Sequence, residues 1–362
     1  MSMFVLLVVV AFLVLLQGWI VGKTGLRKLT YERRFSAADG YEGDQVQMIE
    51  VIRNRKLLPV PMVKAESHIS PHLQFHSDKE VHISGKRYHK SVFYLKPFQQ
   101  ITRTHEVRLL KRGYYNAGSV SVQASDLFGL HMPRMQVDTG AAIEVYPRLL
   151  SPDEIPLPST RWQGDLLVKR WIIPDPIWVS GIRPYTSGDD PGDIHWRATA
   201  RTGVLQVKVH EKTADPKALI IINAQMTENQ WGDLMEYEQQ VVEYMISATA
   251  TLCITSLRQG VEAGFAINVP VDEEEGFTLL APSRSSTREG EILSTMAHLT
   301  LKRTQTILKV LDDLRTLTGM DMLLLSVYDS ELIEQRLDAL RASGNTVSLQ
   351  LIDRIGAQEE AS

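Results

Sequence analysis

Residues 217–223 read Lys217-Ala218-Leu219-Ile220-Ile221-Ile222-Asn223, a short apolar run rich in β-branched side chains that ends at a polar one. Such a run is typical of a strand in a parallel sheet covered on both faces. Beyond it the chain alternates between strand-like and helix-like periodicity. This alternation predicts crossover units and a mainly parallel, doubly wound α/β sheet.

The periodicity also gives the elements of this C-terminal part. In residues 233–257, apolar side chains from Leu234 to Leu252 recur at helical spacing. We expect helices over 233–257, 288–301, 302–317 and 331–341, and strands over 217–223, 260–269, 321–328 and 346–352.

Residues 30–150 differ, since short segments there are separated by turn residues. Val46-Gln47-Met48-Ile49-Glu50-Val51 alternates with the period of two of a half-buried strand. An antiparallel β-sandwich is the expected fold, with strands over 45–53, 60–67, 90–95, 102–110, 118–125 and 142–146. Residues 151–180, rich in proline, are expected to be a linker, and its Trp162, Trp171 and Trp178 indicate that it packs against a domain. The α/β domain is then 181–355.

Residues 1–22 carry no charged side chain, and Met3 to Leu16 is an unbroken apolar run. About 20 such residues suffice for a transmembrane helix. The alternative, a cleaved signal peptide, needs a basic segment before the apolar run and a small-residue cleavage site, and neither is present. The positive charges that follow are expected to keep their flank in the cytoplasm, which predicts a single-pass protein of the cell membrane with cytoplasmic soluble domains. They are Lys23, Arg27, Lys28, Arg33 and Arg34.

The composition excludes several classes of protein. In the 362 residues, 44% hydrophobic and 23% charged side chains indicate packed soluble domains and not disorder. The single cysteine, Cys253, excludes intramolecular disulfides and cysteine-rich zinc sites. The net charge of -4 argues against nucleic-acid binding. Residues 23–150 carry 20 basic and 12 acidic side chains, whereas residues 151–362 carry 19 and 31, so the part next to the apolar segment is expected to face anionic lipid.

Seven histidines lie in the predicted sandwich, among them His68, His72, His76, His82, His89 and His105. A metal site is one reading, although Pro71 interrupts the helix that would align the first three. No cysteine or regular acidic ligand accompanies them, so exposed loop and strand histidines are the favoured interpretation.

The most unusual segment is 183–201, which reads RPYTSGDDPGDIHWRATAR. As a catalytic site, its Asp189, Asp190, Asp193 and His195 would bind a divalent ion or share acid and base roles. As a structural motif, the aspartates would pair with Arg183, Arg197 and Arg201 around a tight turn, and Trp196 would fill the core. We favour the structural reading, because no nucleophile lies beside a base.

With this signature the chain closely resembles the bacterial domain-of-unknown-function family fifty-eight. The matching signature residues are Arg183, Tyr185, Gly188, Asp189, Asp190, His195, Trp196, Arg197 and Arg201. Other segments agree with the family, among them Tyr31-Glu32-Arg33-Arg34-Phe35 and Ser125-Asp126-Leu127-Phe128-Gly129-Leu130. The resemblance implies a membrane-tethered protein with a β-sandwich and a von Willebrand factor A-like domain, often encoded beside a MoxR-type AAA+ ATPase.

Two departures from the pattern stand out. Gly192 and Asp193 replace residues that are usually basic in the family. A metal-binding A domain carries Asp-x-Ser-x-Ser after its first strand, whereas this chain has Asn223, Gln225 and Thr227 there, with Asp329 after a later strand. These side chains lack the anionic oxygens that Mg²⁺ prefers, so we expect a degenerate site without a metal or other cofactor.

The expected function is therefore a non-enzymatic, membrane-tethered scaffold that docks a MoxR-type AAA+ ATPase in assembly or envelope-related processes. Asp189, Asp190, Trp196, Arg197 and Arg201 are expected to organise the docking surface, and the partner is expected at the carboxyl edge of the parallel sheet. The alternative is a metal-dependent hydrolase that uses the acidic signature.

Overall fold

The computed structural model describes residues 2–75, 80–83, 86–151, 153–155, 179–186, 191–210, 217–272 and 275–352. It divides into two compact units, Met1–Arg148 with Met296–His298, and Leu149–Thr295 with Leu299–Ser362. Nearly all of the expected linker, including its three tryptophans, lies outside the described residues.

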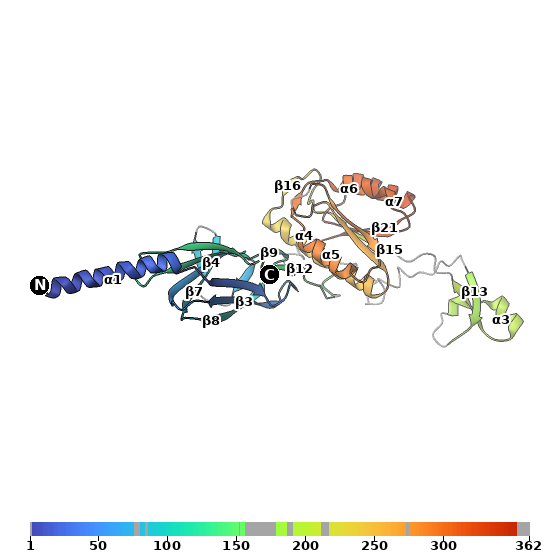
Figure 1. Ribbon diagram of the computed structural model, residues 1–362. Coiled ribbons are helices and arrows are strands. Elements are labelled where there is room, and N and C mark those ends of the chain that lie inside the picture. The colour runs from blue at the N-terminus through green and yellow to red at the C-terminus, as the bar shows by residue number, and fades with distance from the viewer. Residues whose placement is uncertain are drawn as a thin grey trace. The chain divides into compact units, whose positions relative to one another are not determined.

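The first unit begins with helix α1 (Ser2–Thr24), whose residues Met3–Thr24 are long and apolar enough to cross a membrane. At a rise of 1.5 Å per residue this segment is about 33 Å long, close to the roughly 30 Å of a hydrocarbon core. Figure 1 shows α1 extending from one end of the strands that follow.

Those strands form an antiparallel sandwich, as the alternating sequence pattern predicts (Figure 1). One sheet has the order β1 (Leu29–Phe35), β3 (Gln45–Asn54), β8 (Gln100–Leu109), β5 (Leu73–Phe75). The other has the order β11 (Arg134–Asp138), β10 (Ser119–Ser125), β4 (Val60–His68), β7 (Lys86–Leu95), β6 (Glu80–Ile83). A third, smaller sheet contains β2 (Asp39–Tyr41), β12 (Ala142–Tyr146) and β9 (Gly113–Asn116).

The sandwich core consists of two separate apolar clusters. Met48, Val107 and Ile143 belong to one, and Ile52, Val63 and Phe93 belong to the other. Along β3 the inward positions are Val46, Met48, Glu50 and Ile52, so a carboxylate stands between the two clusters where alternation would place an apolar residue.

The second unit contains a five-stranded sheet in the order β18-β17-β15-β20-β21. Its strands are β18 (Thr278–Ser283), β17 (Glu262–Ile267), β15 (Lys217–Ile222), β20 (Asp321–Ser326) and β21 (Thr346–Leu351). All pair in parallel except β18, which is antiparallel to β17. A mainly parallel α/β sheet is thus present where the run at 217–223 predicts one.

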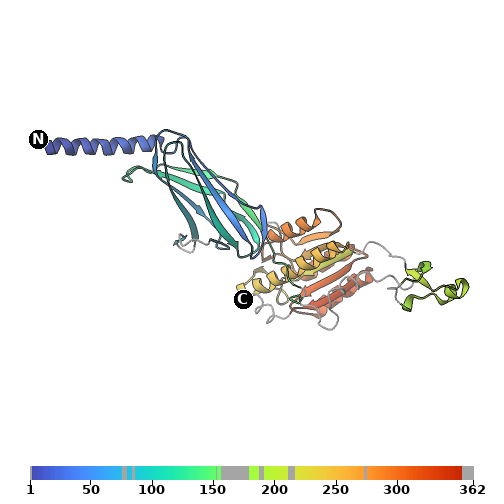
Figure 2. The same ribbon diagram turned by 90° about the horizontal axis from the view of Figure 1, so that it is seen from below.

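Helices lie on both faces of this sheet (Figure 2). On one face, α6 (Ile307–Asp313) and α7 (Glu331–Ala342) share a core with Leu219, Ile221 and Leu324. The alternate strand positions Ile220 and Ile222 are fully buried too. Helix α4 (Glu236–Arg258) contacts β15 and β17, and α5 (Arg288–Ala297) follows β18.

The prediction of one helix over 302–317 is wrong. Lys302–Arg303 form the short strand β19, which pairs with β16 (Gly232–Asp233). Helix α6 begins only at Ile307, because the Thr306 hydroxyl caps it by accepting the Lys309 amide at 3.4 Å. The helix predicted over 288–301 likewise ends early, at Ala297.

Replacing Gly264 by alanine should destabilise the second unit by about 1 to 3 kcal/mol, the usual cost of overpacking a filled site. A Cβ on Gly264 would meet backbone atoms of Leu280, Ala281 and Pro282 in β18, which cannot move aside like a flexible side chain. Gly290→Ala is the matched control, since a Cβ there has no atom within 4 Å and Gly290 lies inside helix α5. That variant should gain stability, because alanine is the better helix former. Denaturant titration followed by hydrogen exchange gives the stability of each variant. Equal stabilities of Gly264→Ala and Gly290→Ala would show that β18 does not pack on β17.

Candidate functional site

The described part of the signature segment has the sequence order strand, helix, strand. Strand β13 (Val179–Pro184) pairs with β14 (Gln206–His210), and between them lie the 3₁₀ turn η1 (Pro191–Asp193) and helix α3 (Trp196–Thr202). Gly188, Asp189 and Asp190 lie outside the described residues.

His195 is the N-cap of α3. Its Nδ1 accepts the backbone amide of Ala198 at 3.0 Å, and it thereby satisfies one of the amides that the start of a helix leaves unpaired. The atom that a base or a metal ligand would offer is therefore engaged in local structure.

Trp196 does not fill the core, contrary to the structural reading of the signature. It is 68% exposed, because α3 has seven residues, none of them buried. Arg197 and Arg201 are exposed as well, and neither forms an ion pair with another residue in the described ranges. Arg183 donates to the Pro184 carbonyl at 3.2 Å and to the Thr186 hydroxyl at 3.3 Å, and the half-buried Tyr185 follows at the end of β13.

The carboxyl edge of the parallel sheet carries uncharged polar residues. Asn223 follows β15, Asn268 follows β17 and Ser326 ends β20, and all three are fully buried. Only Asn223 was singled out by the sequence. Asn268 and Ser326 were missed, although each comes at the end of an apolar run, which is the signal that marks such an edge.

These side chains hold the loops that leave the sheet. Asn223 donates to the Ser326 hydroxyl at 3.0 Å, and its Oδ1 accepts the Gln225 amide at 3.0 Å. Asn268 Oδ1 accepts the Ala224 amide at 2.7 Å, and Gln225 Oε1 accepts the Ile307 amide at 2.7 Å. The oxygens that a metal would need are thus used by backbone amides.

The other two residues of the expected degenerate site, Thr227 and Asp329, are exposed. The Thr227 amide donates to Gln230 Oε1 at 3.2 Å, as part of the turn that leads from β15 to α4. The structure therefore brings Asn223 and Gln225 into one buried network and leaves Thr227 and Asp329 at the surface.

The connection between β15 and α4, together with the first turn of α4, exposes large apolar side chains at this edge. Trp231 is 60% exposed, Met235 65% and Tyr237 46%. The loop is nevertheless well fixed, because β16 within it pairs with β19 and because Leu234 is buried beneath it.

A buried ion pair supports the same loop from below. Arg303 donates to Glu238 Oε2 at 2.8 Å, to Gln230 Oε1 at 2.9 Å and to the Asp233 carbonyl at 3.0 Å. Burial by itself raises the pKa of Glu238, but the hydrogen bonds from Arg303 and from the Met235 amide outweigh it and lower that pKa. The carboxylate therefore stays charged, and the loop presents its apolar side chains in one fixed arrangement.

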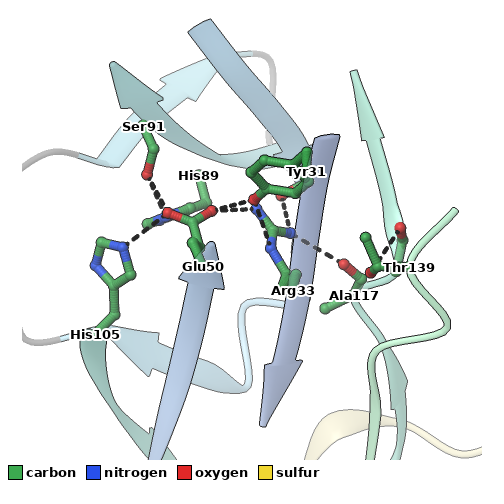
Figure 3. Close-up of polar contacts among 10 residues, drawn as sticks. Tyr31, Arg33, Glu50, His89, Ser91, His105, Ala117 and Thr139 are labelled. Carbon is green, nitrogen blue, oxygen red and sulfur yellow. Dashed lines mark hydrogen bonds and ion pairs between the residues drawn. The ribbon is translucent and has the colours of Figure 1, made fainter. Parts of the chain in front are cut away.

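A second polar cluster lies inside the sandwich (Figure 3). Its central residue, Glu50, stands on β3 between Met48 of one apolar cluster and Ile52 of the other. At its centre Glu50 Oε1 accepts Arg33 at 2.8 Å and the Tyr31 hydroxyl, while Oε2 accepts Ser91 at 2.6 Å and contacts His105 Nε2 at 3.0 Å. The strands β1, β3, β7 and β8 thus all contribute one or more members.

The cluster contains one negative charge, on Glu50, and one positive charge, on Arg33. Burial by itself raises the pKa of Glu50, but the contacts with His105, His89 and Arg33 hold it well below its usual range. Burial also raises the pKa of the Tyr31 hydroxyl far above its usual value. The cluster therefore contains a carboxylate paired with a guanidinium, and both side chains are wholly excluded from solvent.

Among the described residues, Glu50, His89 and His105 could also converge on one ion, since their ligand atoms lie within 4.8 Å of one another. A metal ion there would compete with Arg33, which already neutralises the carboxylate, and would be held beside a buried positive charge. The donors present therefore fit a structural cluster and do not fit a metal centre.

This cluster corrects two sequence expectations. His89 and His105 are mostly buried, not exposed like His68 and His72, because they face the sandwich interior at the level of Glu50. Arg33 is 3% exposed and pairs with Glu50, so it does not belong to the positive flank of α1. The period of two in the sequence could have revealed that Arg33 points inward, since Tyr31, Arg33 and Phe35 occupy the inward positions of β1.

Comparison with known proteins finds a family match over part of the chain. Residues 181–358 match the family described as "Protein of unknown function DUF58", which supports the resemblance over the signature segment and the parallel sheet. No curated protein matches the chain.

Several solved structures are similar to about a third of the chain. A CARDB domain from Pyrococcus furiosus, determined in complex with di-metal ions, is 14% identical, covers 32% of this chain and 91% of its own, and has a TM-score of 0.21. Alpha-2-macroglobulin from Escherichia coli, from domain MG7 to the C-terminus, is 14% identical, covers 33% and 24%, and has a TM-score of 0.24. A non-cellulosomal cohesin from Archaeoglobus fulgidus is 10% identical, covers 34% and 94%, and has a TM-score of 0.21.

Proposed function

We propose that this chain is a non-enzymatic, membrane-tethered interaction protein whose second unit docks a protein partner at the carboxyl edge of its parallel sheet. The observation that carries the proposal is the set of exposed side chains Trp231, Met235 and Tyr237, on the β15–α4 loop and the first turn of α4, which the buried Arg303–Glu238 pair fixes. We call these three side chains the docking patch.

The chemistry of the docking patch suits a protein partner. Tryptophan, tyrosine and methionine are enriched at the centres of protein interfaces, where they fill pockets and exclude water. A loop that is already ordered loses little conformational entropy on binding, so more of the contact energy is kept as affinity. The carboxyl edge of an open α/β sheet is also where such folds commonly bind their ligands.

The polar side chains at the sheet edge and in the signature segment support docking over catalysis. Asn223, Gln225 and Asn268 use their side-chain oxygens on backbone amides, and His195 uses its Nδ1 on the Ala198 amide. Catalytic acids and bases need such atoms available to a substrate.

The partner we propose is a MoxR-type AAA+ ATPase, and the domain that binds it a von Willebrand factor A-like domain with a degenerate metal site. Both follow from the family resemblance. The proposed cellular role is in assembly or envelope-related processes.

Helix α1 is proposed to anchor the protein in the cell membrane as a single span, with both units in the cytoplasm. Four positive side chains remain at its C-terminal flank once Arg33 is assigned to the sandwich core: Lys23, Arg27, Lys28 and Arg34. They suffice for the charge asymmetry that retains a flank on the cytoplasmic side.

Photocrosslinking in intact cells tests the docking proposal. A photoreactive phenylalanine analogue would replace Trp231, and in a matched control it would replace Arg258, the exposed last residue of α4 at the other end of that helix. We expect an AAA+ ATPase to crosslink through position 231 and not through position 258, with a yield that depends on ATP. Absence of any protein adduct at position 231, with and without ATP, would contradict the proposal.

Trp231→Ala should weaken partner binding by at least about 2 kcal/mol, or roughly thirtyfold, as for an interface residue of the hot-spot kind. The fold should be unaffected, because Trp231 is largely exposed. Leu279→Ala on β18 is the control, since Leu279 is a partly exposed apolar residue outside the docking patch. Titration of the purified partner against both variants in detergent gives the two affinities, and equal affinities would remove Trp231 from the interface.

A further inference from the structure

Three connections of the sandwich lie at the end from which α1 leaves. They are residues 55–59 between β3 and β4, 96–99 between β7 and β8, and 126–133 between β10 and β11. Strand pairing places them together, because Leu29 is opposite Asn54, Val60 is opposite Leu95, and Ser125 is opposite Met62. We call these three connections the α1-side rim, and Figure 2 shows α1 leaving the sandwich at this end.

The rim exposes apolar side chains to an unusual degree. Leu57 is 74% exposed, Leu127 71%, Phe98 70% and Phe128 62%. Leu58, Leu130 and Met132 in the same connections are exposed as well. Scattered apolar residues on a surface need no explanation, but a group of large ones at one end of a domain marks a surface that is covered in the working protein.

The connection 126–133 is attached to α1 itself. The buried Asp126 accepts Gln17 Nε2 at 2.9 Å through Oδ2 and the His131 amide at 3.3 Å through Oδ1. A Cβ on Gly18 would come within 2.8 Å of His131 Nδ1, and one on Gly22 within 3.2 Å of its ring, so the two glycines provide the space that His131 occupies. The loop therefore runs along the helix from Gln17 to Gly22.

That position fixes how deep the loop lies if α1 spans a bilayer. Gln17 precedes Lys23 by about 9 Å along the axis, at the helical rise of 1.5 Å per residue. The interfacial layer on each side of the hydrocarbon core is about 5 to 7 Å thick. With the Lys23 ammonium at the headgroups, 4.6 Å from the Trp19 ring, Gln17 and Asp126 lie on the hydrocarbon side of the headgroup charges.

The charges around the rim are also those expected of a surface that faces anionic lipid. Exposed basic side chains border it from α1, from the segment before β1 and from two of the connections: Lys23, Arg27, Lys28, Arg55 and Lys96. Such a group beside an apolar surface is attracted to anionic lipid headgroups. Lys56 fixes the geometry, because its ammonium donates to the carbonyls of Thr24 at 2.8 Å, of Arg27 at 3.0 Å and of Gly25 at the end of α1.

We propose that the α1-side rim inserts into the bilayer that α1 crosses, with Leu57, Phe98, Leu127 and Phe128 in the interfacial layer and the basic side chains at anionic headgroups. The inference rests on the proposed membrane anchor. It adds a second, non-helical contact between the sandwich and the lipid, so the first unit is seated on the membrane and not only linked to it.

Site-specific labelling of the full chain in vesicles of phosphatidylethanolamine and phosphatidylglycerol tests this. Phe128→Cys and Leu57→Cys place a thiol on the rim, and Gln45→Cys places one on an exposed residue at the opposite end of β3. Wild type gives the background, because burial raises the pKa of the Cys253 thiol to about 12 and keeps it unreactive. We expect the two rim thiols to be protected from a water-soluble, membrane-impermeant maleimide. A nitroxide attached at either position should collide more often with dissolved oxygen, which enters lipid, than with a nickel chelate, which stays in water. The Gln45→Cys thiol should react fully.

The outcomes separate the rim from the anchor. Protein that stays with the vesicles after alkaline extraction, yet reacts equally at Phe128→Cys and Gln45→Cys, keeps the anchor and overturns the rim insertion. Protein released by the extraction overturns both. Protection accompanied by spin–spin broadening between Phe128→Cys labels of two chains would assign the rim to contact with a second copy and would also overturn the lipid contact.

Discussion

Glu50→Gln should lower the stability of the first unit by about 3 to 5 kcal/mol, the usual cost of breaking a buried ion pair from one side. The substitution leaves the Arg33 guanidinium fully buried without its carboxylate, since both side chains are 0% exposed. It also weakens the contacts that Tyr31, Ser91 and His105 make with the same group.

Hydrogen exchange followed by mass spectrometry measures this effect in the full chain in detergent, because peptides of each unit are read separately. Peptides of β3 and β8 should exchange faster in the variant, and those of β15 should not change. Glu32→Gln is the control, since Glu32 pairs with Arg53 at 3.4 Å on the surface and such pairs contribute at most about 1 kcal/mol. A combined Arg33→Met and Glu50→Leu variant should be more stable than Glu50→Gln, because it leaves no unpaired charge. If the combined variant were the least stable of the set, cavity effects and not charge would dominate.

The same carboxylate predicts a response to acid. The pKa of Glu50 in the folded protein lies below the ordinary value of 4.5, so ionised Glu50 stabilises the fold fully above that value. The stabilisation is lost progressively as the pH falls below about 4.5 toward the folded pKa. Exchange of the β3 peptides should therefore rise on acidification in wild type more than in Glu50→Gln, once the intrinsic pH dependence of exchange is subtracted.

Arg303→Met should have a comparable effect on the second unit. It leaves Glu238, 1% exposed, as a buried carboxylate without its cation, and it removes the donors to Gln230 and to the Asp233 carbonyl. We expect a loss of about 3 to 5 kcal/mol in the stability of the β15–α4 connection. Because the docking patch rests on that connection, partner affinity should fall with it although Arg303 itself is buried.

Arg258→Met is the matched control for this prediction. Arg258 pairs with Glu289 at 3.0 Å, but both side chains are largely exposed, so removal should cost no more than about 1 kcal/mol. Exchange of peptides covering 224–238 and partner titration would be measured on both variants. A well-protected loop and an unchanged affinity in Arg303→Met would show that the loop is ordered by its apolar contacts instead.

Periodicity was sufficient to predict most of the framework, because apolar burial is what periodicity reports. The alternation at 46–51 corresponds to β3, and the apolar run at 217–223 corresponds to β15 in the middle of the parallel sheet. The strand Leu29–Phe35 was missed, since its inward Arg33 made the segment look like a charged flank. A charged residue at an inward position is interpretable only when its partner strand is known.

The sites were harder to predict, because they depend on residues far apart in the sequence. Asn223 was found from its place after a strand, but its partner Ser326 lies about one hundred residues later. The docking patch depends on Arg303, which the sequence assigned to a helix and which in fact lies on β19. The exposure of Trp196 was not foreseen either, since a tryptophan in an aromatic and arginine-rich motif is more often buried.

The junction between α1 and β1 consists of only residues 25–28, and the Lys56 ammonium holds its carbonyls. A long flexible linker would let the sandwich sample many heights and tilts above a membrane, with an average reach that grows with linker length. If α1 crosses a bilayer as proposed, a short, hydrogen-bonded junction would hold the sandwich at one height and one tilt. A partner bound to this sandwich would then meet other membrane proteins by diffusion in the membrane plane, at a fixed distance from the lipid. Inserting a few glycines after Thr24 would let the sandwich sample a range of distances again.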